Sequence, residues 1–228
     1  MDLIFVHGAL VRDGAWWWQR TAERLEISSH SLELPSCSSG GGLVEDAVAL
    51  RAALDQVESA IVVGHSYGGT VIAEAGSHPA VSHLVLISSY LPLVGQTHAE
   101  ITASDDPPSI AVHDGLLQLD GYDEQSFAAR FLHDAPDAAA AAMERLTPQS
   151  AADFTTPLTQ AGWQGVDSTY LVCTSDQSTS LELQRSHAAR ATRSLDLPTG
   201  HHPFISRPDL VASAVSRIAR LGAGEALD

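Results

Sequence analysis

The sequence has no lysine and only two cysteines. Its twelve basic residues are all arginines and stand against twenty-eight acidic ones, which gives a formal charge of −16 at pH 7. Such a chain would repel phosphate backbones and anionic lipid surfaces, so we expect no nucleic-acid or membrane partner. Cys37 and Cys173 stand far apart. We expect both to be reduced thiols, because a disulfide framework needs more and closer cysteines.

Long apolar runs are also missing. No stretch reaches the roughly eighteen apolar residues of a membrane span. The chain opens with the apolar segment Leu3 to Val6, without the basic segment and cleavage site of a secretion signal, so we expect a cytoplasmic protein. A length of 228 residues fits one compact domain.

Short apolar stretches alternate with amphipathic stretches of helical length along most of the chain. This alternation predicts an α/β fold with a mostly parallel, six-stranded sheet and helices on both faces. The expected strands are Leu3–Val6, Ser31–Leu34, Ala60–Val63, His83–Ile87, Thr169–Cys173 and Ser194–Leu197. The expected helices are Trp17–Glu26, Leu43–Glu58, Gly68–Ser77, Ser180–Arg190 and Pro208–Leu221.

One interval interrupts this alternation. Residues 91–163 contain no convincing buried strand, but they include the helical stretches Asp123–Leu132 and Pro136–Leu146. We interpret this interval as a helical cap inserted into the core. Residues 1–90 then form the first part of the core and residues 164–228 the second part.

The strongest local motif is Gly64-His65-Ser66-Tyr67-Gly68-Gly69, which follows a predicted strand and opens a predicted helix. A tight turn in this position lifts the Ser66 hydroxyl above the sheet, which favours a nucleophile. The Tyr67 N–H lies at the helix start without a partner in the helix and can bind an oxyanion. The turn His7-Gly8-Ala9 after the first strand could supply a second amide, and His7 itself is expected to hydrogen-bond this turn.

A nucleophilic serine needs a base, and the position after a strand selects among eleven histidines. His201 follows Gly200 in the loop after the last strand, which favours it over its neighbour His202 only modestly. The acid that orients the base is expected after the preceding strand, where Asp176 stands. Asp167 and Asp196 would need unusual geometry to reach the same imidazole.

These motifs, together with Gly14-Ala15-Trp16-Trp17-Trp18 and Gly200-His201-His202-Pro203-Phe204, resemble the small α/β-hydrolases related to plant methyl esterases, hydroxynitrile lyases and bacterial carboxylesterases. The resemblance spans nearly the whole chain and implies an α/β-hydrolase fold. It implies a catalytic triad of Ser66, Asp176 and His201, and an oxyanion hole made by the amides of Ala9 and Tyr67. The triad order Ser, Asp, His is the one found in that fold.

The chain departs from the hydroxynitrile lyases at two positions. Those enzymes carry a threonine after the histidine of the first turn and a lysine directly after the catalytic histidine, where this chain has Gly8 and His202. Since the lysine helps to hold departing cyanide, esterase chemistry is preferred over lyase chemistry.

The sequence therefore predicts a serine carboxylesterase that cleaves small apolar or aromatic esters through an acyl-enzyme, with no metal or organic cofactor. Its partner would be a small-molecule ester, and a homodimer is possible. The pocket is expected between the strand ends and the cap, with walls from Leu117, Tyr122, Phe131 and Trp163, and also from Tyr67, Leu116, Leu119 and Phe127. The alternatives are a ligand-binding receptor on the same scaffold, a hydroxynitrile lyase, and a cofactor-free oxygenase or cyclase with His201 as base.

Overall fold

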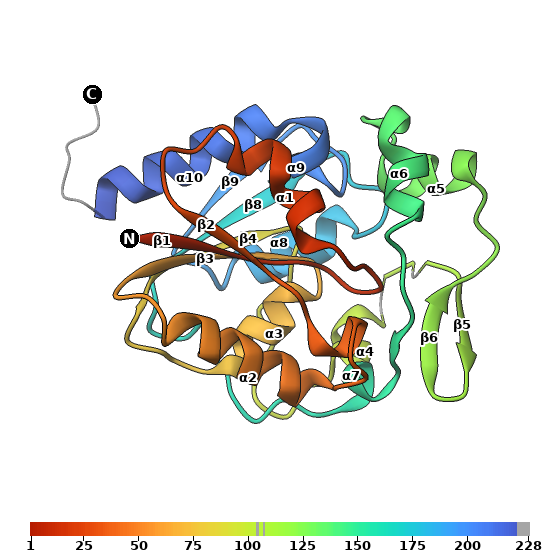
Figure 1. Cartoon of the computed structure of the whole chain (residues 1–228), viewed down its shortest axis with the longest axis horizontal. Helices are drawn as coiled ribbons and strands as arrows, with labels where there is room; N and C mark the ends of the chain where they lie inside the picture. The colour runs from red at the N-terminus through yellow and green to blue at the C-terminus, as the bar shows by residue number, and fades with distance from the viewer. Residues whose placement is uncertain (104, 107, 223–228) are drawn as a thin grey trace.

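The computed structural model describes residues 1–103, 105–106 and 108–222, and residues 223–228 of the predicted second core part lie outside the described residues. A central sheet of six parallel strands has the order β2-β1-β3-β4-β8-β9 (Figure 1). The strands are β1 (Asp2–Val6), β2 (Ser29–Leu32), β3 (Ala60–His65), β4 (Val81–Ile87), β8 (Ser168–Cys173) and β9 (Arg193–Leu197). The predicted six-stranded α/β sheet is confirmed. Only β2 is displaced: it pairs with β1 through Leu32 and Val6, and the chain leaves the sheet before the buried Leu34.

Helices cover both faces of this sheet because successive strand residues point to opposite sides. Phe5 and Val63 face the side of α1 (Gly14–Ala22), α9 (Pro203–Ser206) and α10 (Pro208–Gly222). Val6 and Val62 face the side of α2 (Leu43–Leu54), α3 (Gly68–Ala75) and α8 (Leu181–Ala188). Figure 1 shows α1 and α10 above the sheet and α2 and α3 below it. Within the described ranges, no helix is long and apolar enough to cross a membrane.

Residues 98–155 of the segment between β4 and β8 lie beyond the carboxyl ends of the strands, and the chain then returns along the face of α2 and α3 (Figure 1). The segment contains α4 (His98–Thr102), β5 (Ile110–His113), β6 (Leu116–Leu119), α5 (Glu124–Phe131), the 3-10 helix η2 (Pro136–Ala138), α6 (Ala139–Met143), β7 (Gln149–Ser150) and α7 (Ala152–Thr155). The helices α5, η2 and α6 match the two helical stretches predicted from the sequence, whereas α4, α7 and the antiparallel sheet β5-β6-β7 were not predicted. Most side chains of β5 and β6 are partly or fully exposed, so they do not read as a buried strand. Asp114 and Gly115 join the two strands, both with positive φ, as hairpin turns require.

Candidate active site

Ser66 occupies the turn between β3 and α3. Its φ is 49°, a left-handed conformation that a non-glycine residue adopts only when the surroundings enforce it. The surroundings are tight: a Cβ at Gly68 would lie 2.6 Å from the Val6 carbonyl oxygen, and one at Gly69 would overlap Ser89 and Tyr90. The glycines of the motif are therefore required for the close approach of the turn to β1 and β4, which fixes the strained serine at the strand ends.

His201 and Asp176 meet at the same edge of the sheet. Asp176 follows β8, His201 follows β9, and the His201 Nδ1 to Asp176 Oδ2 distance is 2.7 Å. Because an ionised carboxylate only accepts, this contact places the imidazole proton on Nδ1. Nε2 is then unprotonated in neutral His201 and can accept a proton.

The Asp176 carboxylate is held by several donors. The backbone N–H groups of Ser178 and Thr179 donate to Oδ1 at 2.7 and 3.0 Å, and the Ser88 hydroxyl donates to Oδ2 at 2.6 Å. Burial opposes ionisation of this group. Attraction to His201 and these hydrogen bonds outweigh burial and lower the pKa of the Asp176 carboxyl. Asp176 is thus an anion at neutral pH.

The turn after β1 lies directly against Ser66. A Cβ added to Gly8 would be 3.3 Å from the Ser66 Cβ. Among the hydrogen bonds within the described part of the chain, the backbone N–H groups of Ala9 and Tyr67 have no acceptor. Two amide donors beside the serine are therefore available to a ligand.

The other imidazoles near Ser66 are structural. His7 Nε2 accepts from Leu34 N at 3.2 Å and His7 Nδ1 donates to the Gly8 carbonyl at 2.8 Å, so His7 holds the turn, as the sequence suggested. His202 Nδ1 donates to the Phe131 carbonyl at 2.9 Å. Burial lowers the pKa of His202 to about 3, so it stays neutral at working pH.

The nearby His65 is also neutral, because burial lowers its pKa well below the usual range. Ring nitrogens of His65, His201 and His202 lie within 4.8 Å of one another, close enough to hold a metal ion. An ion bound there would compete with protonation of His201. One ring nitrogen of each of these histidines already contacts a protein oxygen, so each has one nitrogen left as a ligand atom.

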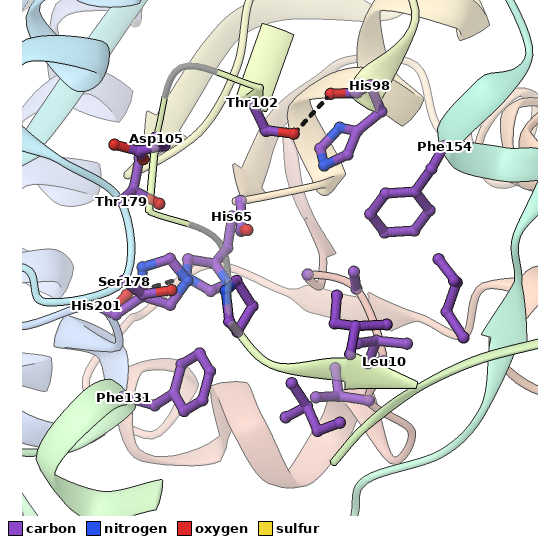
Figure 2. A pocket seen from close by; sticks show the side chains of 18 of the residues that line it. Leu10, His65, His98, Thr102, Asp105, Phe131, Phe154, Ser178, Thr179 and His201 are labelled. Atoms are coloured by element: carbon purple, nitrogen blue, oxygen red, sulfur yellow. Dashed lines mark hydrogen bonds between the residues drawn. The ribbon is translucent and has the colours of Figure 1, made fainter. Parts of the chain in front are cut away.

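One cavity of about 520 Å³ opens over Ser66 and His201. Figure 2 shows Phe131, Ser178 and His201 at one end, and Leu10 and Phe154 at the other. The remaining wall is mainly apolar and includes residues of the turn after β1, the β5-β6 hairpin, α5 and the segment between α6 and β7, among them Val11, Val112, Leu117, Leu119, Phe127 and Leu146. A cavity of this size and character suits a small, largely apolar molecule.

Some of the predicted wall residues line this cavity and others lie elsewhere. Leu117 and Phe131 line the cavity, as do Leu119 and Phe127. Tyr122 instead packs behind Phe127 and Phe131. Trp163 packs on the α2–α3 face and donates its ring N–H to the Pro92 carbonyl at 2.7 Å. Tyr122 and Trp163 are therefore not among the residues that line the cavity. The place of Trp163 could not be read from the sequence, because the sequence does not tell on which side of the sheet the chain returns from the cap.

Two further residues predicted to line the pocket, Leu116 and Tyr67, also lie outside the cavity wall. Leu116 points away to solvent, with 42% of its surface exposed. Tyr67 is buried with its ring stacked on Phe154 at 5.7 Å, and its hydroxyl points to Asp46. Both lie outside the set of residues that line the cavity.

Sequence reasoning missed three polar residues of the site. Ser88 contacts Asp176, and the Tyr90 hydroxyl lies 3.4 Å from Thr179 Oγ1 on the cavity wall. Burial raises the pKa of Tyr90 to about 12, so its hydroxyl keeps its proton. His98 lines the cavity and its Nδ1 is 2.8 Å from Thr70 Oγ1. Ser88 and Tyr90 directly follow β4, so the rule that selected Ser66 and Asp176 after their strands could have found them.

A six-stranded parallel sheet with a cap over its carboxyl edge, and a strained serine after β3, define an α/β-hydrolase fold. The family model for the alpha/beta hydrolase family matches residues 3–214. The chain therefore belongs to this family.

Known proteins agree with this assignment. The alpha/beta hydrolase nvfD of Aspergillus novofumigatus is 27% identical over 234 residues, covering 90% of this chain and 89% of that protein. Methylesterase 8 of Arabidopsis thaliana is 30% identical over 104 residues, 39% of this chain and 38% of that protein. The crystal structure of a pyrethroid hydrolase from Sphingobium faniae matches with a TM-score of 0.85, 24% identity and 99% coverage of both chains. The chain is thus similar over most of its length to a protein named as a hydrolase, and over part of its length to a plant methylesterase.

Proposed function

We propose that this protein is a serine hydrolase that cleaves carboxylic esters through an acyl-enzyme. Ser66 is the nucleophile, His201 the general base and Asp176 the residue that orients the base. The observation that carries this proposal is the 2.7 Å contact between His201 Nδ1 and Asp176 Oδ2, beside a cavity that Ser66 and His201 both line. It selects the tautomer in which Nε2 can take a proton from a serine hydroxyl.

The proposed reaction follows from these positions. Ser66 Oγ attacks the ester carbonyl while His201 Nε2 takes its proton, and Asp176 stabilises the resulting imidazolium. The amides of Ala9 and Tyr67 hold the tetrahedral oxyanion, a contribution of about 10²–10³ in kcat for each donor in comparable sites. His201 then returns the proton to the departing alcohol. Water repeats the same steps on the acyl-enzyme and releases the acid.

The cavity supports a neutral, largely apolar substrate. Asp105 and Asp106 lie on its wall, so a carboxylate or phosphate group would meet negative charge there. Aromatic and aliphatic side chains cover most of the remaining wall, and the structurally similar protein of Sphingobium faniae is named a pyrethroid hydrolase. We infer that the substrates are small apolar or aromatic esters.

Hydroxynitrile lyase chemistry is less well supported. The position after His201 carries His202, and burial lowers its pKa to about 3. This neutral side chain cannot supply the positive charge that would hold cyanide.

The test is labelling by a fluorophosphonate, followed by intact mass and peptide mapping. We expect one adduct, on Ser66, and loss of p-nitrophenyl ester turnover by several powers of ten in Ser66→Ala. Circular dichroism and thermal unfolding should show that the variant is folded. A folded Ser66→Ala enzyme with most of its activity would overturn the assignment, and a protein that takes up no label would favour a ligand receptor.

A further inference from the structure

A chain of buried hydrogen bonds joins the two sides of the proposed oxyanion hole. The Tyr67 hydroxyl donates to Asp46 Oδ2 at 3.1 Å, and the Ser36 hydroxyl donates to the same oxygen at 2.7 Å. Gln149 Nε2 donates to Ser36 Oγ at 3.2 Å, and the Leu10 N–H donates to Gln149 Oε1 at 2.8 Å. We call these five residues the polar bridge. It starts at Tyr67 and ends next to Ala9, the two residues whose amides face the proposed oxyanion.

Gln149 is the member of the polar bridge that comes from the cap. It lies in β7 and is fully buried. Its oxygen accepts from Leu10 N, which can only donate, so the amide orientation is fixed. Its nitrogen then donates to Ser36 Oγ and also to Asp153 Oδ2, at 3.0 Å. Oxygen and nitrogen are thus both used, which gives this side chain a single orientation.

Leu10 needs such support. Its φ is 61°, a left-handed conformation that a leucine does not hold by itself. The cap also binds this turn by backbone pairing, because Thr147 N donates to Leu10 O and Arg12 N donates to Arg145 O, each at 2.9 Å. The Leu10 N–H belongs to the peptide group between Ala9 and Leu10, so its hydrogen bond to Gln149 fixes the orientation of that peptide group. Gln149 therefore acts on the residue beside the proposed oxyanion donor.

We propose that Gln149 is a positioning residue of the oxyanion hole, which from the cap holds the Ala9 and Tyr67 amides in register. This inference rests on the proposed function. An oxyanion exists only in the tetrahedral transition state and intermediate, so misplaced donors lower kcat and leave substrate binding nearly unchanged. Catalysis then requires that the cap is packed on the core with Gln149 bonded to Leu10, in addition to its enclosing the cavity.

The charges around Gln149 supply a sharp test. Asp46 and Asp153 are both buried, and burial raises the pKa of each, that of Asp153 to about 6. Gln149→Glu would keep an acceptor for Leu10 N but would place a carboxylate oxygen against Asp153 Oδ2. Adding Asp153→Asn restores a hydrogen bond between positions 149 and 153. The amide at position 153 would now donate, and the carboxylate at position 149 would accept. The double variant then has the same number of carboxylates as the natural chain.

The experiment compares Gln149→Glu, Gln149→Leu, Asp153→Asn and Gln149→Glu/Asp153→Asn in the full chain. The readouts are kcat and KM for a p-nitrophenyl ester, Ki for a trifluoromethyl ketone whose adduct carries the oxyanion, and Tm. Thr159→Val is the matched control. It removes the bond from Thr159 Oγ1 to Glu74 Oε1, a contact of 2.6 Å between the cap return and the core that lies outside the polar bridge.

We expect kcat to fall by about tenfold to a hundredfold in Gln149→Glu and Gln149→Leu, short of the loss of a whole oxyanion donor, with KM within about threefold. Ki for the ketone should rise in proportion to the loss in kcat. The double variant should recover most of the loss in Gln149→Glu, and Thr159→Val should keep the natural kcat. A double variant no better than Gln149→Glu, or losses that appear only in KM or follow Tm, would overturn the inference. Natural enzyme without Ser66-dependent turnover would overturn the proposed function instead.

Discussion

Ser88 and His201 share one oxygen of Asp176. The Ser88 hydroxyl lies 2.6 Å from Asp176 Oδ2, the His201 Nδ1 lies 2.7 Å from the same atom, and Ser88 Oγ is 3.3 Å from His201 Nδ1. Ser88 is fully buried and has a φ of 41°, so this hydroxyl is held in place against backbone strain. The Ser88 hydroxyl and the His201 N–H therefore both donate to the same oxygen of the Asp176 carboxylate.

The first prediction concerns pH and the natural enzyme. His201 must be neutral to accept the Ser66 proton, so kcat/KM for an uncharged ester should rise with pH along the titration of one imidazole. Asp176 stays ionised throughout, because its pKa is lowered. Rates from pH 5 to 8 measure this acidic limb, and the residual activity of His201→Ala should lack it. A flat profile under conditions where substrate binding does not limit the rate would contradict general-base catalysis by histidine.

The second prediction moves that limb. Ser88→Ala removes a donor that competes for Asp176 Oδ2, so the carboxylate should stabilise the imidazolium more strongly. The midpoint of the limb should rise by on the order of half to one pH unit, since one unit corresponds to about 1.4 kcal/mol. The control is Ser82→Ala, because Ser82 lies at the other end of β4 and bonds only the Ala60 carbonyl among the described residues. A midpoint that stays in place or falls in Ser88→Ala would show that Ser88 does not compete for this charge.

The third prediction separates the two adjacent histidines. His201→Ala should lose activity by on the order of 10³ or more while staying folded. His202→Ala should lower Tm, because it removes a ring stacked on Trp17 at 5.1 Å and leaves the Phe131 carbonyl without its donor. It should keep far more activity than His201→Ala. The measurement is kcat and Tm of the two purified variants. A His202→Ala variant that is well folded but inactive would show that His202, and not His201, is the general base.

The positions of the proposed catalytic residues follow largely from the sequence, because parallel strands all have their carboxyl ends at the same edge of the sheet. Ser66 is predicted from the glycine motif after a strand, and Asp176 and His201 from their places after the last two strands, in agreement with the family resemblance. In the structure all three follow strands at that edge. Position after the strand favours His201 over His202 only modestly, since neighbouring residues share the same loop. The choice between them needed the Phe131 carbonyl, a cap atom that takes the N–H of His202.

Hydrogen bonds between polar residues far apart in the sequence could not be predicted from the sequence. Gln149 bonds Leu10 across 139 positions, and no pattern around a lone glutamine indicates such a partner. The β5-β6 hairpin was missed for a different reason: its side chains are largely exposed, and only the turn at Asp114 and Gly115 indicates it. Periodicity detects buried faces and strand ends, whereas a polar network becomes visible only in three dimensions.

The last prediction concerns acid stability. Burial lowers the pKa of six imidazoles, those of His7, His65, His83, His98, His187 and His202. Below about pH 6.5 the unfolded chain protonates these groups while the folded chain keeps them neutral, so the unfolded state binds more protons. Asp46 and Asp153 act in the opposite direction, since their pKa values are raised. Six groups against two should make the free energy of unfolding decrease as the pH falls from 7 to 5.

His83 gives this prediction a single-residue form. It lies in β4, away from the cavity, with Nε2 2.9 Å from Thr169 Oγ1, and burial lowers its pKa to about 4. His83→Gln can keep that hydrogen bond but cannot titrate. The slope of unfolding free energy against pH between about 6.5 and 4 should therefore shrink, by at most about 1.4 kcal/mol per pH unit for one proton. Urea unfolding at pH 7, 6 and 5 measures the slope, with the surface variant His30→Gln as control. An unchanged slope in His83→Gln would mean that His83 takes up its proton in the folded chain as readily as in the unfolded one.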